Sequence, residues 1–242
     1  MAPSYSDAQQ KLGPELKPYR KKVFLACKTG QRKRVGAQAE LKKSLEQLRT
    51  DHLGLYQLHG LTDVNKDVDV AFAKGGAMEV LIEAKKAGLV RHLGFSAHSV
   101  EAAMTAMDRY DFDSVLFPVN FACYYGGDFG RQVIKKAKSK KVAVLIIKAL
   151  ADRPWQTKDP PGRKEFPKCW YEPLWDRKEA ELGLRFALSE PVAAAIPPAE
   201  EKMFWLAVDI AMDFKPINLK EKREIEAWGV RTMPIFKYQK EA

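Results

Sequence analysis

The sequence is poor in cysteine. Its 242 residues include only three, Cys27, Cys123 and Cys169, and no two of them stand at CxxC spacing. A disulfide framework or a cysteine-based zinc site needs more thiols, or thiols in closer pairs. The four histidines show no HExxH or comparable ligand spacing, so we expect no metal site. This cysteine usage fits a reducing compartment, and by default the cytoplasm.

Long apolar runs are also missing. The N-terminal stretch is polar, without the apolar core of a signal peptide, and no apolar run is long enough to cross a bilayer. Lysine and arginine exceed aspartate and glutamate by 41 to 31, a net charge of +10. These basic residues are spread in pairs along the chain and are not interleaved with aromatic residues. We therefore expect solvated helix surfaces, with neither nucleic acid nor a membrane as partner.

The sequence does contain a regular alternation of two patterns. Six short runs that are apolar nearly throughout, as in parallel strands covered on both faces, are separated by segments with helical spacing. The runs predict strands at Val23–Cys27, Leu53–Leu58, Val90–Phe95, Ser114–Val119, Val142–Ile147 and Val192–Ile196. The segments between them predict helices at Ala39–Leu48, Glu79–Ala87, Val100–Met107, Gln132–Lys138 and Glu181–Leu188. Gly88 is placed to end the second helix in a left-handed conformation.

This alternation allows an open doubly wound sheet or a (β/α) barrel. No GxGxxG follows an early strand, which disfavours the dinucleotide-binding doubly wound fold. In a barrel, functional residues gather where the strands end. Each predicted strand is followed by such a candidate: Lys28, His59, Ser96, Asn120, Lys148 and the pair Pro197–Pro198. We predict an α/β fold of (β/α)8 TIM-barrel type, incomplete, with six of the usual eight strands, forming a single domain over residues 1–242.

Two segments lie outside this alternation. Asp152–Pro173 carries five prolines and cannot be one regular element. It is either a long loop over the barrel mouth or a solvated excursion without a role, and the sequence leaves both open. After the last strand, Glu200–Phe214 and Leu219–Gly229 predict C-terminal helices over about residues 200–230. The first is expected to contribute to a mixed core through Phe204, Leu206, Val208 and Ile210.

Several pieces of the sequence, taken in order, resemble the aldo/keto reductases. The best are SYSDAQQKLGPEL with RKKVFLACKTG, SLEQLRTDHLGLYQLHG, GLVRHLGFSAHS and VLFPVNF, and the likeness runs from Ala2 to roughly Ile217. The resemblance implies a (β/α)8 barrel that binds extended NADPH at its mouth and reduces an aldehyde or ketone to an alcohol. It also implies that the chain starts inside a family motif, with the first two strands and the first helix missing.

The family uses a tetrad of Asp, Tyr, Lys and His. By motif, the resemblance assigns catalytic roles to Tyr5 in PSYSDAQQKLG, Lys28 in LACKTG and His59 in LYQLHG. A tyrosine can protonate a carbonyl oxygen if a nearby ammonium lowers its pKa, and a histidine can orient the carbonyl. The motif's Asp would fall before Met1, and Ser6 replaces the usual glycine. We therefore expect impaired activity, with a non-catalytic barrel remnant acting as a binding or interaction protein as the alternative.

The resemblance also assigns a cofactor site. Ser96 in GFSAH matches the serine that hydrogen-bonds the nicotinamide carboxamide, and Asn120 follows the next strand. The stretch along the pyrophosphate and the phosphate loop correspond to Lys148, Ala149, Leu150, Pro197, Pro198 and Ala199. The resemblance alone implies NADPH as the cofactor in preference to NADH. It also implies a small carbonyl compound as the substrate.

Six strands cannot close an eight-stranded barrel, so the Val23–Cys27 and Val192–Ile196 strands should each have an unpaired edge. We expect self-association through these open edges, or an N-terminal segment or another chain that covers the gap.

Overall fold

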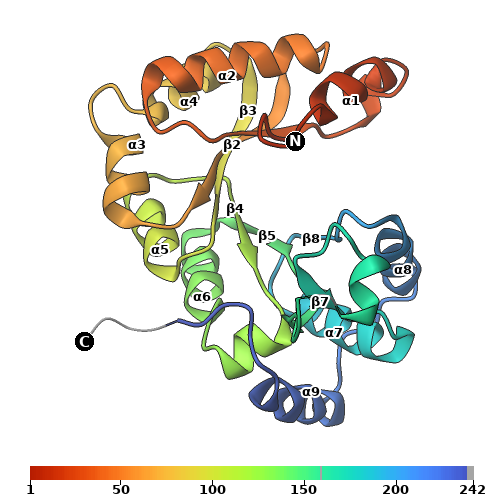
Figure 1. Cartoon of the computed structure of the whole chain (residues 1–242). Helices are drawn as coiled ribbons and strands as arrows, with labels where there is room; N and C mark the ends of the chain where they lie inside the picture. Colours follow the sequence, from red (N-terminus) through yellow and green to blue (C-terminus); the bar gives the residue numbers. More distant parts are fainter. Residues whose placement is uncertain (159, 239–242) are drawn as a thin grey trace. The chain divides into compact units, whose positions relative to one another are not determined.

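The structure is a computed structural model that describes residues 1–158 and 160–238 (Figure 1). Its contacts divide the chain into two compact units. The first comprises Met1–Leu116 and Ser139–Val142, and the second comprises Phe117–Lys138 and the chain from Ala143 onward. The expectation of a single domain over residues 1–242 stays a prediction.

The first unit alternates helices with parallel strands. Helices α2 and α4 pack against each other and against β1 and β3, respectively. Every residue from Leu53 to Leu58 is buried, which explains why this strand is apolar at nearly every position instead of alternating; Gln57 is the polar exception within the run. The elements are α1 (Ala8–Leu16), η1 (Arg20–Lys22), β1 (Ala26–Thr29), α2 (Arg34–Gln47), β2 (Leu53–Leu61), η2 (Val64–Asp69), α3 (Val70–Phe72), α4 (Ala77–Lys86), β3 (Val90–Ala97), α5 (Val100–Arg109) and the start of β4 (Ser114–Pro118).

Local signals set several of these boundaries. Gly88 has φ +75° after α4, and its amide donates to the Lys85 carbonyl, so the predicted glycine stop is confirmed. The Ser99 side chain accepts from the Ala102 amide and caps α5. The first predicted strand is wrong at its start, because β1 begins at Ala26 and not at Val23. Ala26 pairs with Leu55, so the same register would place Phe24 opposite Leu53, the first residue of β2. Val23 would lie beyond the start of β2 and therefore has no strand residue to pair with.

The second unit combines the remaining strands with four α-helices, the first of which lies mostly in it. Its elements are the end of β4, η3 (Ala122–Gly126), most of α6 (Arg131–Lys140), β5 (Ala143–Ile147), β6 (Ala151–Pro154), η4 (Pro161–Lys164), β7 (Tyr171–Pro173), α7 (Arg177–Ser189), β8 (Ala194–Ile196), α8 (Glu201–Met212) and α9 (Leu219–Arg231). The Asn218 side chain and Glu221 form a capping box that starts α9. The two predicted C-terminal helices are therefore confirmed as α8 and α9.

The predicted core face of α8 is partly wrong. Ile210 is buried as expected, but Phe204 is 41% exposed and Leu206 and Val208 are only half-buried. The fully buried face consists of Met203, Ala207 and Ile210. These residues follow the i, i+4, i+7 stripe of a helix packed on one side, whereas the predicted residues stand two apart and so cannot share one helix face.

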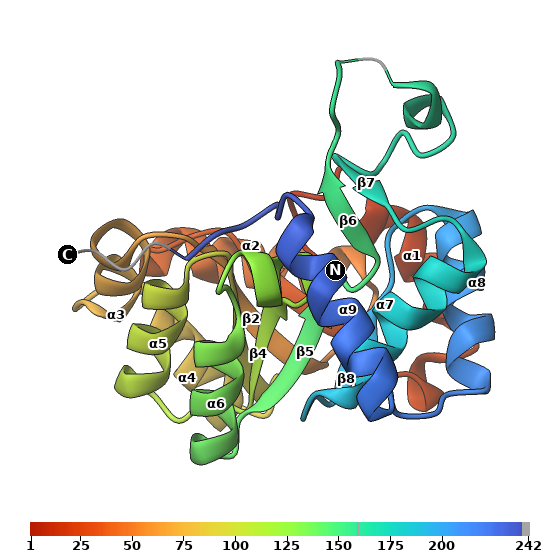
Figure 2. The ribbon, with the colours of Figure 1, turned by 90° about the horizontal axis from the view of Figure 1, so that it is seen from below.

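The segment Asp152–Pro173 is not one regular element, as predicted. Its two ends pair as the antiparallel strands β6 and β7, and Figure 2 shows the loop between them extending beyond both strands. Within the loop, Trp155 Nε1 donates to the Cys169 carbonyl over 2.9 Å, which ties the two sides together. Asp159 in this loop lies outside the described residues. A role for the loop over a barrel mouth stays a prediction.

The described strands include a six-stranded sheet in the order β1-β2-β3-β4-β5-β8. Within this sheet β1 pairs in parallel with β2, β2 with β3, β3 with β4, and β5 with β8. Each strand is reached through a helix from the one before, so the fold is an incomplete (β/α)8 barrel, with six of its eight strands in the described chain. As predicted, β1 and β8 stand at the two ends of the order.

An N-terminal segment packs beside β1. Gln9 Nε2 donates to Cys27 Sγ over 3.1 Å and to Ser44 Oγ over 3.2 Å, which links α1 to both β1 and α2. A Cβ on Gly13 would lie 2.1 Å from the Gln47 carbonyl oxygen, so only glycine allows α1 to approach the end of α2 this closely. The Met1 amine donates to the Ala26 carbonyl over 2.6 Å. The N-terminal segment is thus tied to β1. Coverage of the barrel gap and self-association through open edges stay predictions.

Candidate active site

Three predicted site residues lie in the last residues of parallel strands in the first unit. Lys28 is in β1, His59 in β2 and Ser96 in β3. The sequence placed each of them just after its strand, and this is wrong because all three strands run further than their apolar runs. β2 continues through an irregularity between Leu58 and Leu61 before it ends. The carboxyl ends of neighbouring parallel strands lie at one edge of the sheet, which brings these side chains to one region.

Tyr5 joins this region from the N-terminal segment. Lys28 Nζ donates to the Tyr5 hydroxyl over 2.9 Å, and His59 Nε2 lies 3.5 Å from the same hydroxyl. The Tyr5 and His59 rings meet edge to face, with centroids 5.6 Å apart. The structure therefore brings a phenol, an ammonium and an imidazole together around one oxygen atom. Such a hydroxyl can pass its proton to a substrate oxygen while the ammonium stabilises the phenolate.

His59 is held between two hydroxyls. Its Nδ1 lies 3.5 Å from Ser4 Oγ and its Nε2 lies 3.5 Å from the Tyr5 hydroxyl. Burial, followed by the charges of Lys28 and Arg32, lowers the pKa of His59 to about 4. The imidazole is therefore neutral near pH 7, and it can donate one hydrogen bond and accept another.

This pKa makes the stability of the protein depend on pH. The unfolded chain binds a proton at His59 near pH 6.5, whereas the folded chain binds it only near pH 4. Unfolding therefore takes up a proton between these two values, so the free energy of unfolding should fall as the pH drops from 6.5 to 4. Urea unfolding at a series of pH values measures this slope. His59→Gln should flatten it, while the control His52→Gln should keep it; an unchanged slope in His59→Gln would contradict the assignment.

Lys28 is buried without a carboxylate partner. Its residue is 8% exposed, and within residues 1–158 and 160–238 no aspartate or glutamate forms an ion pair with it. The ammonium instead donates to Tyr5 and lies 5.0 Å from the centre of the Tyr5 ring. A buried charge with only neutral partners is costly, so the ammonium favours partial negative charge on the one oxygen within its reach.

Ser6 holds Tyr5 through a strained backbone. Its φ of 52° lies in the left-handed region, which favours glycine. We expect Ser6→Gly to stabilise the protein by about 0.5–1 kcal/mol, measured by thermal or urea unfolding. Ser6→Ala keeps the Cβ and serves as the control without a gain. Equal stability of the glycine and alanine variants would show that the strain is absent.

Ser96 and Asn120 are buried polar residues with unused hydrogen-bonding groups. Ser96 Oγ accepts from the Gly60 amide over 2.7 Å, which leaves its hydroxyl hydrogen to donate. In the second unit, Asn120 Oδ1 accepts from the Cys123 amide over 2.9 Å. Asn120 Nδ2 is buried and has no partner in the described part of the chain. An unpaired buried amide is costly, and it suits the carboxamide oxygen of a nicotinamide.

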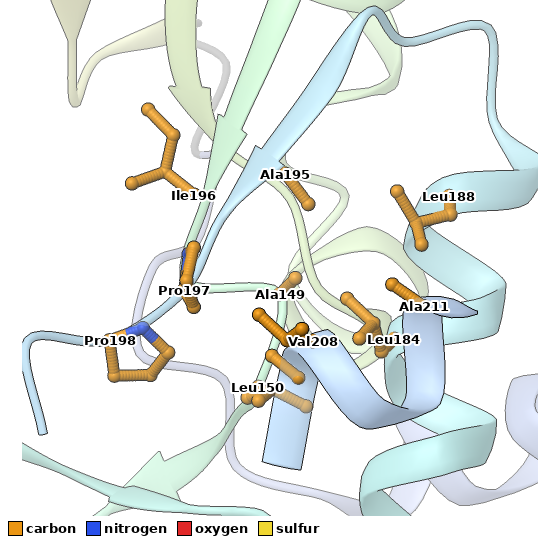
Figure 3. A pocket seen from close by; sticks show the side chains of 11 residues that line it. Ala149, Leu150, Leu184, Leu188, Ala195, Ile196, Pro197, Pro198, Val208 and Ala211 are labelled. Carbon is orange, nitrogen blue, oxygen red and sulfur yellow. The ribbon is translucent and has the colours of Figure 1, made fainter. Parts of the chain in front are cut away.

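Four of the remaining predicted cofactor residues line one cavity in the second unit. The cavity measures about 240 Å³ and is bounded by β8, α7 and α8 (Figure 3). Ala149, Leu150, Pro197 and Pro198 contribute to its wall, together with Leu184, Leu188, Ala195, Ile196, Ala207, Val208 and Ala211. None of these side chains can donate a hydrogen bond, so the cavity suits an apolar or aromatic group better than a pyrophosphate.

Lys148 and Ala199 are not in this wall. Lys148 has φ +67°, and its Nζ lies 5.5 Å from the ring centre of Trp170 and 5.3 Å from that of Tyr171. The ammonium is thus held over two aromatic faces in the loop that follows β5. The Ala199 carbonyl accepts from Lys168 Nζ over 3.3 Å, just before α8. Glu200 accepts from the Lys168 amide and places a carboxylate beside the start of that helix.

Sequence reasoning missed Arg32. This arginine stands in the run QRKR, where nothing distinguishes it from its solvated neighbours. In the structure it donates to the backbone of His59, 27 residues away, and to the Asp67 carboxylate. Only the fold brings these groups together, so no local sequence signal could have identified it.

A family model connects this geometry to known enzymes. The model described as the aldo/keto reductase family matches residues 1–168, more than half of the chain. The chain belongs to the aldo/keto reductase family. No curated protein matches it by sequence.

Solved structures of aldo/keto reductases share its fold. The holo form of AKR11C1 from Bacillus halodurans has a TM-score of 0.72 at 20% identity, with 98% of this chain and 83% of that chain covered. An aldo-keto reductase from Klebsiella pneumoniae in complex with NADPH has a TM-score of 0.70 at 18% identity, covering 100% and 82%. AKR2E4 from Bombyx mori in complex with NADP has a TM-score of 0.66 at 17% identity, covering 97% and 79%.

Outside residues 159 and 239–242, no group of three or more His, Cys, Asp or Glu side chains could hold a metal ion. No helix in the part of the chain described by the structure is long and apolar enough to span a membrane.

Proposed function

We propose that this aldo/keto reductase reduces a small aldehyde or ketone to an alcohol with NADPH. The observation that carries the proposal is the hydroxyl of Tyr5, 2.9 Å from Lys28 Nζ and 3.5 Å from His59 Nε2. A proton donor beside a cation and a neutral imidazole is the arrangement that carbonyl reduction needs. Membership of the family supports the same reaction class.

Each residue of this cluster has a distinct role in the proposed reaction. Bound NADPH supplies the hydride. The Tyr5 hydroxyl gives its proton to the carbonyl oxygen, which gains negative charge during reduction. The Lys28 ammonium stabilises the phenolate that remains on Tyr5. His59, neutral because its pKa is lowered to about 4, donates a hydrogen bond that orients the carbonyl oxygen.

The residues proposed to bind the cofactor fit a nicotinamide nucleotide in two respects. Ser96 retains a hydroxyl hydrogen and Asn120 a buried NH2 group without a partner in the described residues, and both groups suit a carboxamide oxygen. Lys148 is proposed to bind a phosphate group, and the apolar cavity beside it supplies non-polar contacts. Complexes with NADP and NADPH among the similar structures support NADPH over NADH.

Titration of the protein with NADPH, followed by nucleotide fluorescence, tests the proposal. NADH is titrated in parallel, and Lys148→Ala should weaken NADPH binding. The same protein is then mixed with NADPH and a panel of small aldehydes and ketones, and nucleotide oxidation is recorded. Carbonyl-dependent oxidation of NADPH is the expected result. Absence of binding to either nucleotide would exclude this function.

A second candidate is a non-catalytic member of the family that acts as a binding or interaction protein. The observation that favours it is the lack of a carboxylate paired with Lys28 in the described chain, since a carboxylate would fix the position and charge of the ammonium. The two candidates differ in turnover. Saturable NADPH binding without carbonyl-dependent oxidation, for every carbonyl compound in the panel, would favour the second.

A further inference from the structure

His59 lies at a bulge in β2. Leu58 pairs with Phe95 and Leu61 pairs with Ala97, so three steps along β2 match two steps along β3. The extra residue falls at His59–Gly60, and Gly60 has φ +65°, a conformation that favours glycine. A bulge re-aims the side chains next to it. The direction of the His59 imidazole therefore depends on what holds this bulge.

Arg32 bonds to the bulge from one side. Its NH2 group donates to the His59 carbonyl over 2.7 Å and to the Gly60 carbonyl over 3.2 Å. On the other side, the Gly60 amide donates to Ser96 Oγ over 2.7 Å. The backbone groups that the bulge frees from the strand ladder are thus bonded to two side chains.

Asp67 fixes the Arg32 guanidinium. Its Oδ1 accepts from Arg32 Nε over 2.9 Å, and the two side chains are only 14% and 17% exposed. Its Oδ2 accepts from the Thr62 amide over 2.7 Å, the Thr62 hydroxyl over 2.9 Å and the Asp63 amide over 3.1 Å. This carboxylate is therefore anchored to the chain just after β2. A rigid guanidinium fork can span Asp67 and two carbonyls, whereas a lysine ammonium cannot.

We propose that Arg32, anchored by Asp67, is the positioning residue that fixes the His59–Gly60 bulge and thereby aims the His59 imidazole at the Tyr5 hydroxyl. The catalytic meaning of this role rests on the proposed function. The structural claim does not, since it concerns only the orientation of one imidazole. Among the described residues, Arg32 donates hydrogen bonds to Asp67 and to the carbonyls of Gly30, His59 and Gly60, and to neither Tyr5 nor Lys28. It therefore acts through the backbone of β2.

The test compares Arg32→Lys with the control Arg34→Lys. Arg34 is also paired with carboxylates, Glu79 and Glu83, but these lie on α4 and not at the bulge. Imidazole ¹H–¹⁵N spectra and the nuclear Overhauser contact between Tyr5 and His59 report the geometry without any turnover. In Arg32→Lys the His59 signals should shift and the contact should weaken, while Arg34→Lys should match the wild type. Asp67→Asn, which removes the anchor, should change the same signals.

Kinetics give the second readout. Arg32→Lys should lower kcat by about tenfold or more, because a small misplacement of a catalytic group is costly, with the KM for NADPH unchanged. If the wild type shows no turnover but the spectra change as expected, the proposed function fails and the positioning role stands. If the His59 signals and the Tyr5 contact of Arg32→Lys and Asp67→Asn equal those of the wild type, the positioning role is wrong. Should Arg32→Lys not fold, Asp67→Asn alone decides between these outcomes.

Discussion

Tyr5→Phe should lower carbonyl-dependent NADPH oxidation by about 10²-fold or more, the range typical of losing a general acid. The variant loses the one hydroxyl that lies within hydrogen-bond distance of both Lys28 and His59. Its ring remains, so the edge-to-face contact with His59 is kept. Initial rates at saturating NADPH and carbonyl compound measure the effect.

NADPH binding separates this result from a general loss of structure. The Kd for NADPH should be unchanged, whereas the melting temperature should fall modestly, because the buried Lys28 ammonium loses the hydroxyl to which it donates. Tyr19→Phe makes the same chemical change at an exposed position in the same unit and should keep wild-type rates. Wild-type turnover in Tyr5→Phe would show that another group protonates the carbonyl oxygen.

Lys28→Met should have opposite effects on activity and stability. Methionine has nearly the length of lysine but no charge, so the phenolate of Tyr5 loses the ammonium that stabilises it, and kcat should fall by about 10²-fold or more. The melting temperature should stay constant or rise, because a buried ammonium without an ion-pair partner in the described residues is removed.

Rates and unfolding curves of the same Lys28→Met preparation test both halves of this prediction. Lys33→Met, at an exposed position after β1, is the matched control and should change neither quantity. A large loss of stability in Lys28→Met would mean that the ammonium has a favourable partner in the folded protein. Retained activity would mean that Tyr5 does not need the cation.

The sequence did not indicate the antiparallel strands β6 and β7. It was sufficient to locate the six strands of the parallel sheet, because each is apolar nearly throughout, including β8, which is largely exposed. It located their ends less well. Lys28, His59 and Ser96 are polar and so interrupt the apolar pattern, but their backbone still belongs to β1, β2 and β3. A prediction based on polarity therefore placed the ends of these strands too early. The α8 core face was wrong for a related reason. Apolar residues two apart cannot share a helix face, and the packing of α7 against α8, which selects the buried face, is a tertiary contact.

The cluster of Tyr5, Lys28 and His59 was predictable only through motif resemblance. A tyrosine at position 5 gives no sign that it contacts residues 23 and 54 positions later. The bulge at Gly60 and its bonds to Arg32 and Ser96 could not be predicted, since they depend on a register difference between two strands. What the sequence carries is the identity of the groups; their geometry is set by contacts between distant segments.

The docking of α1 has a consequence for the order in which function and fold are lost. Tyr5 comes directly before α1, and α1 packs on α2 through Gly13 and Gln9. The contact between Tyr5 and Lys28 therefore depends on this packing. That helix contains Pro14 and has no side-chain cap at its start, so it is a weak element of the unit. Segments of this kind open locally before a domain unfolds. On heating, Tyr5 should therefore leave its partners while the strands that carry Lys28 and His59 are still intact.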